Sequence, residues 1–159
     1  MNPCPCGFLG APAGHLRACR CTPDQVARYQ GRLSGPLLDR IDLQVDVPAI
    51  APAQLMQAPE GEPSAVVAAR VAAARERQRA RQGCINADLG PAEVPLHCAP
   101  DAAASALLQR AAERLGWSGR GLHRTLRVAR TLADLAGADT IGMTEMAEAL
   151  QYRMAVIGS

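Results

Sequence analysis

Between residues 64 and 154 the chain consists of Ala- and Leu-rich segments bounded by residues that start or stop helices. Ser64, Asp101 and Ser118 are of the type that caps a helix N-terminus, and a glycine follows three of the segments. Aromatic residues make up only 3% of the chain, so an Ala- and Leu-rich core favours helices. The pattern predicts a mainly α fold with a four-helix bundle, its helices covering residues 64–82, 101–115, 118–136 and 143–154.

Helical spacing also predicts which faces of these helices are buried. The face expected for the third helix consists of Leu122, Leu126, Ala129, Leu132, Ala133 and Ala136. The face expected for the last helix consists of Met143, Met146, Ala147, Leu150 and Met154, where methionine serves as core filler. The first helix ends in an arginine run, and its interleaved polar residues favour a solvated face over a DNA-binding one; the run is Arg75, Arg77, Arg79 and Arg81.

The N-terminal third has different signals. Thr22 can cap a helix that runs to about Arg32, with Pro23 at its first position and Gln25 completing a capping box. Strict alternation of apolar and polar residues over 41–47 predicts a strand with one wet face. The Ala-, Pro- and Gly-rich stretch 49–63 is typical of a linker and marks the expected domain boundary.

Two Cys-x-Cys pairs lie in the first 21 residues, Cys4 with Cys6 and Cys19 with Cys21, separated by 12 residues. Four thiolates of this kind can bind one tetrahedral zinc, although a single intervening residue is tighter than the usual two to four. Nearby Arg17 and Arg20 could offset the negative charge, and His15 could replace one cysteine. The alternative is four reduced thiols that pack a loop. Cys84 and Cys98 have no paired partner and are expected to be buried thiols.

Composition excludes several functions. All 17 basic residues are Arg, so the chain cannot contain a phosphate loop with its Lys and cannot form a complete ATP site alone. We therefore expect no ATP hydrolysis from this chain by itself. A net charge of +2 is too small to indicate a nucleic-acid surface. The absence of a long apolar run or a signal peptide favours a cytoplasmic protein that does not enter a membrane, with reduced cysteines.

Four residue strings carry a resemblance to a known family. They are Met1 to Gly7, Ser34 to Leu43, Val128 to Gly137 and Ala149 to Arg153. In this order they resemble the Mg-chelatase-like AAA+ ATPases of the ComM/YifB competence-protein family. The resemblance implies that residues 1–48 are the C-terminal end of an AAA+ core with a Cys-rich insertion, that 49–63 are a linker, and that 64–159 are a helical lid.

The same resemblance implies the activity. The parent protein would be a hexameric ring that uses ATP with Mg²⁺ to remodel DNA, by helicase action or branch migration in recombination. DNA would be contacted through an N-terminal part that this chain lacks. Two other functions stay open: a free-standing zinc-binding adapter that contacts nucleic acid through its arginines, and a chelatase-type motor that acts on a protein complex.

Particular residues match functional positions of the family. Asn2 matches the sensor 1 residue, which would orient the attacking water, and Arg40 matches the arginine finger that enters the neighbouring subunit's ATP site. Arg120 matches the sensor 2 arginine of the lid, with Arg127 two turns further along the same face. Arg124 and Arg130 are alternatives for sensor 2. Without the resemblance, Asn2-Pro3 would be a turn and Arg40 would pair with Asp39, Asp42 or Asp46.

Overall fold

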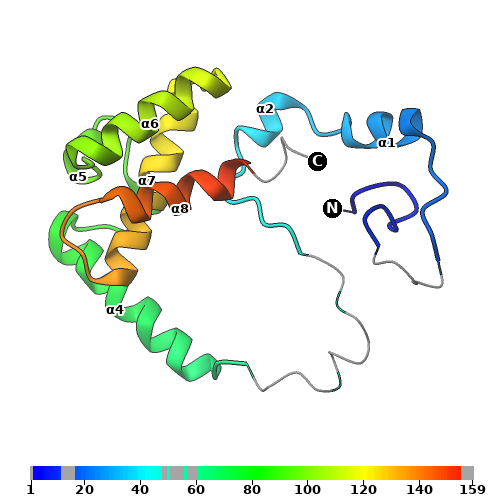
Figure 1. Cartoon of the computed structure of the whole chain (residues 1–159). Helices are drawn as coiled ribbons and strands as arrows, with labels where there is room; N and C mark the ends of the chain where they lie inside the picture. The colour runs from blue at the N-terminus through cyan, green and yellow to red at the C-terminus, as the bar shows by residue number, and fades with distance from the viewer. Residues whose placement is uncertain (1, 12–16, 48–49, 51–55, 57–60, 155–159) are drawn as a thin grey trace. The chain divides into compact units, whose positions relative to one another are not determined.

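The computed structural model describes residues 2–11, 17–47, 50, 56 and 61–154 (Figure 1). The chain forms two compact units, one made of Met1–Ile41 and Asp46–Pro59 and the other of Asp42–Val45 and Glu60–Ser159. The described part of the chain is mainly helical, as predicted, and contains no β-strand.

The second unit contains the four helices that the sequence predicts. They are α4 (Ser64–Gln82), α6 (Ala102–Leu115), α7 (Gly119–Ala136) and α8 (Met143–Met154). Asp101 and Ser118 act as the expected N-caps, because their side chains accept hydrogen bonds from the backbone N–H groups of Ala104 and Gly121. Ser64 does not: Pro63 occupies the N-cap position of α4 and Ser64 is already helical.

Three of these helices end as expected at glycines in the left-handed conformation, namely Gly83, Gly116 and Gly137 with φ of 77°, 60° and 77°. Between α4 and α6 the chain forms two short helices that the sequence analysis missed, the 3₁₀ helix η1 (Asn86–Asp88) and α5 (Val94–His97). This connection contributes Leu89, Val94 and Cys98 to the core, which explains its ordered course.

Helix α7 is central to the second unit because it contacts both α4 and α8, and α8 also contacts α6 (Figure 1). The core contains Ala129 and Ala133 from α7 and Met146, Ala149 and Leu150 from α8. The predicted face of α8 is therefore correct at its centre but wrong at Met143, whose side chain is 51% exposed. The predicted face of α7 is confirmed at Ala129 and Ala133, and its three half-buried leucines pack against the same core, namely Leu122, Leu126 and Leu132. It is wrong at Ala136, which is exposed, and it missed three buried polar residues, namely Thr125, Arg130 and Asp134.

The first unit contains α1 (Pro23–Gln30) and α2 (Gly35–Leu38). The capping box predicted at Thr22 and Gln25 is present, with both reciprocal hydrogen bonds formed. Ser34 caps α2 by accepting a hydrogen bond from the N–H of Leu37. Helix α1 ends at Gln30, two residues before the predicted position.

The strand predicted over 41–47 is wrong. No neighbouring strand pairs with it among the described residues, and the one backbone hydrogen bond recorded for 42–45 runs from the N–H of Gln44 to the carbonyl of Tyr152 at 2.7 Å. Leu43 and Val45 are 51% and 65% exposed, so the alternating pattern has no core beneath it. A strand needs a paired edge as well as an alternating sequence. Most of the predicted linker 49–63 lies outside the described residues.

Candidate metal centre and lid arginines

The four N-terminal cysteines that the sequence singled out lie together. Their Sγ atoms are all within 4.8 Å of one another. The Sγ of Cys4 lies 3.3 Å from that of Cys6 and 3.7 Å from that of Cys19, and Cys6 and Cys19 are 3.6 Å apart. The predicted alternative ligand His15 lies outside the described residues.

Local turns bring these sulfurs together. The chain reverses after Cys4, with Gly7 at φ 81° and its N–H bonded to the Cys4 carbonyl at 3.0 Å. Positive φ favours glycine at this position. Cys21 directly precedes Thr22, the N-cap of α1, and Gln30 at the other end of α1 donates to the carbonyl of Pro3 at 3.0 Å. The cysteine loop and α1 therefore hold each other in place.

The cluster perturbs the ionisation of its own thiols. A hydrogen bond from the backbone N–H of Phe8, assisted by Cys4, lowers the pKa of Cys6 to about 6. The backbone N–H of Cys6 favours the thiolate of Cys21, but the neighbouring sulfurs and burial outweigh it and raise the pKa of Cys21 to about 12. Four thiols whose sulfurs lie this close together cannot all lose their protons unless a cation among them offsets the repulsion between the thiolates.

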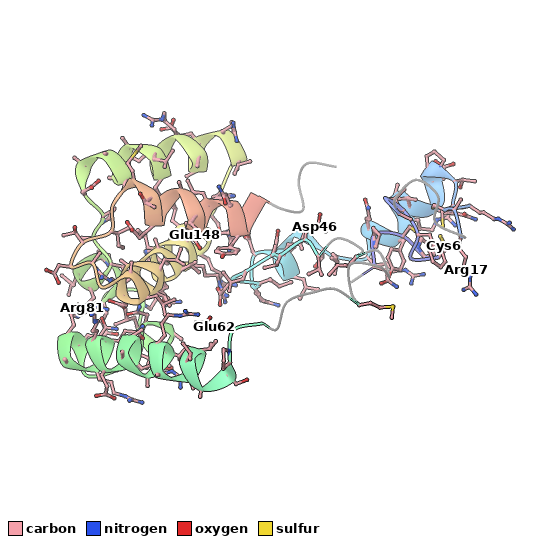
Figure 2. The ribbon with its side chains drawn as sticks, turned by 60° about the horizontal axis from the view of Figure 1, so that its bottom comes forward. Cys6, Arg17, Asp46, Glu62, Arg81 and Glu148 are labelled. Atoms are coloured by element: carbon pink, nitrogen blue, oxygen red, sulfur yellow. The ribbon has the colours of Figure 1, made fainter. Side chains whose placement is uncertain are left out.

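The arginines expected to offset this charge are exposed, Arg17 and Arg20 alike. Arg17 lies with its guanidinium 5.9 Å from the centre of the Phe8 ring, a cation–π contact. Arg17 and Cys6 are labelled in Figure 2. Cys98 is a fully buried thiol, as predicted, and burial raises its pKa to about 11. Cys84 is half-buried and packs against the same core.

The residues that match sensor 1 and the arginine finger both lie in the first unit. Asn2 is exposed, and its side-chain amide lies beside Gly7, where an added Cβ would be 3.5 Å from Nδ2. Arg40 is exposed and follows α2 directly. Of the acidic partners considered for Arg40, Asp42 forms an ion pair with Arg124 in the second unit.

The four arginines of α7 have different environments. Arg120 is the most exposed of them. Arg127 donates to the carbonyl of Leu89, and its Nε is buried without a partner. Arg124 pairs with Asp42. Arg130 is 3% exposed and all of its nitrogens donate to protein oxygens, so it is not available as a nucleotide-binding residue.

Sequence reasoning missed a buried ion network on α7. Asp134, with its side chain 1% exposed, accepts two hydrogen bonds from Arg81 of α4, at 2.6 and 3.1 Å. Arg81 is labelled in Figure 2. It also accepts from Arg130 at 3.1 Å and from Asn86 at 2.8 Å. Burial alone would raise the pKa of Asp134, but the bonds from Arg81 and Asn86 lower it. Arg81, predicted to lie on a solvated face, is therefore structural.

A signal for this network exists in the sequence, because Arg130 and Asp134 are four residues apart and hence neighbours on one helix face. Their burial could not be predicted, since it depends on Arg81 and Asn86 arriving from α4 and η1. None of the helices in the described part of the chain is long and apolar enough to cross a membrane.

Comparison with known proteins matches both the first and the second unit to models of one protein family. The family model described as magnesium chelatase, subunit ChlI C-terminal, matches residues 61–153, and the model described as magnesium chelatase, subunit ChlI, matches residues 1–55. The chain therefore belongs to the Mg-chelatase-like family that includes ComM and YifB, as the sequence resemblance predicted.

Individual relatives are similar over nearly the whole chain. The YifB protein of Salmonella typhimurium is 44% identical over 156 residues, which are 96% of this chain and 29% of that protein. The competence protein ComM of Haemophilus influenzae is 41% identical over 159 residues, 98% of this chain and 30% of that protein. This chain thus spans less than a third of the length of these relatives.

Proposed function

We propose that this chain is the C-terminal portion of a ring-forming AAA+ ATPase, a hexameric motor that uses ATP with Mg²⁺ to remodel DNA. The observation that carries the proposal is the pair of family matches over residues 1–55 and 61–153. The name of the Haemophilus relative, a competence protein, favours DNA as the substrate. The phosphate loop and the DNA-contacting segments would come from outside these residues, because this chain contains no Lys.

Three exposed polar residues would act in the ATP site. Arg40 would enter the site of the neighbouring subunit and stabilise charge on the transferring phosphoryl group. Asn2 can both donate and accept a hydrogen bond, which suits a residue that orients the attacking water. Arg120 would contact the phosphates from the lid, and its exposure favours it over Arg127, which is bonded to Leu89.

The test is an Arg40→Ala substitution in a full-length family member that carries this segment. We expect hydrolysis to fall by about 10³ to 10⁵ while ATP binding is retained, because a finger supplied in trans acts on the transition state. Arg28→Ala, which removes another exposed arginine of the same unit, is the matched control and should keep activity. Mixing Arg40→Ala with a phosphate-loop variant should restore some hydrolysis. If the assembled mixture stays inactive, Arg40 is a structural residue.

A second candidate is a chelatase-type motor that acts on a protein complex, which the description of the matching family favours. The two motors differ in their activator. Stimulation of hydrolysis by added DNA in the full-length protein supports the DNA motor, and hydrolysis that DNA leaves unchanged supports the chelatase type.

A further inference from the structure

The first unit has almost no hydrophobic core. Among its described residues only Cys4 is buried, whereas every member of the main core cluster belongs to the second unit. A segment this small and poor in buried apolar surface needs a covalent or metal cross-link to hold one structure. Such a cross-link would form at the cluster of four cysteines, Cys4, Cys6, Cys19 and Cys21.

The sulfur positions match the geometry of one particular cross-link. Four thiolates at about 2.3 Å from a central zinc in a tetrahedron are about 3.8 Å from one another. Three of the sulfur pairs are 3.3, 3.6 and 3.7 Å apart, and all four sulfurs lie within 4.8 Å of one another. A disulfide requires about 2.05 Å, and all four cysteines are free. The single residue inside each Cys-x-Cys pair therefore does not prevent a tetrahedral arrangement.

The kind of ligand also suits zinc, because all four residues of the cluster are cysteines. Four cysteine ligands leave no open coordination position, so the site is of the structural type and not of the catalytic type.

We propose that Cys4, Cys6, Cys19 and Cys21 bind one structural Zn²⁺ that replaces a hydrophobic core in the first unit. The ion would join the turn after Cys4 to the start of α1, because Cys21 directly precedes the N-cap Thr22. It would thereby hold the segment that carries Asn2, whose side chain lies beside Gly7. This site does not depend on the proposed ATPase role, since it needs only residues of this chain.

The first experiment is metal analysis of this chain, purified in buffers without added metal. We expect about one zinc per chain, and its loss in Cys4→Ser and Cys21→Ser. Cys84→Ser is the matched control, because Cys84 lies in the second unit, and it should keep the zinc. Replacement of zinc by Co²⁺ in the unmodified chain should produce the intense absorption of a tetrahedral four-thiolate site. This last measurement stays decisive if a variant fails to fold.

The second experiment asks what the ion does. Removal of zinc with a chelator should abolish amide-exchange protection in α1 (Pro23–Gln30) and leave α7 (Gly119–Ala136) protected. Protein that is free of metal, or that contains iron instead of zinc, would overturn the assignment. Unchanged protection of α1 after complete zinc removal would overturn the structural role. Zinc removal that leaves the amide-exchange protection of α7 unchanged is a result about the first unit alone. It does not test ATP hydrolysis in the full-length protein.

Discussion

The buried carboxylate of Asp134 offers the sharpest test of what holds the helical unit together. Asp134→Asn keeps the size of the side chain but removes its charge. The native carboxylate is 1% exposed and accepts bonds from Arg81, Arg130 and Asn86. In the variant, the new amide N–H₂ would face the guanidinium donors, and the 3% exposed Arg130 would lose its counter-charge.

The expected magnitude follows from this burial. Removing one partner of a buried ion pair costs about 3 to 5 kcal/mol, because the remaining charge stays away from water without compensation. Arg81 is 26% exposed and can regain some hydration, and Arg130 keeps its bonds to the carbonyls of Ala138 and Asp139. We therefore expect the lower end, about 3 kcal/mol. For a unit of this size that corresponds to a fall in melting temperature of roughly 12 to 24 °C.

The assay is thermal and urea unfolding of the 159-residue chain, followed by far-UV circular dichroism. Asp139→Asn makes the same chemical change three residues beyond α7 at an exposed carboxylate, and it should leave the free energy of unfolding within about 0.5 kcal/mol of the unmodified value. If Asp134→Asn unfolds at the same temperature as Asp139→Asn, the ion network does not stabilise the unit and the reasoning fails.

Two further predictions concern the same unit. The pKa of Asp134 is lower in the folded state than in the unfolded state. Its stabilising contribution is therefore present above the unfolded pKa of about 4 and is lost as the pH falls through the folded value. Urea midpoints measured across acidic pH should fall less steeply for Asp134→Asn than for the unmodified chain, and equal slopes would contradict this. Gly137→Ala and Gly116→Ala should each cost about 1 to 2 kcal/mol, because both glycines have positive φ. The Cβ added at Gly137 would lie 2.6 Å from Nη1 of Arg77, but this flexible side chain can move aside. If Gly137→Ala lowers the free energy of unfolding by much more than this in the same assay, Arg77 is held rigidly.

Much of the helical architecture could be predicted because its signals are local. A cap such as Ser118 or Asp101 bonds to a backbone N–H three residues away, and a glycine such as Gly137 stops a helix through its own φ. The capping box of Thr22 and Gln25 depends on four consecutive residues. Family membership could also be predicted, since it depends on residue strings that need no three-dimensional information.

The sequence by itself thus determined where the four long helices of the second unit lie, which cysteines could act together, and the family. Tertiary structure decided the rest, because those features depend on residues that arrive from elsewhere in the chain. Among the described residues, the alternating segment 41–47 has no strand to pair with, so its apolar side chains stay exposed. Arg130 and Asp134 became core residues once Arg81 supplied a counter-charge from α4. The sulfurs of Cys4 and Cys19 lie 3.7 Å apart although the two residues are 15 positions apart in the sequence, a proximity that spacing alone does not fix.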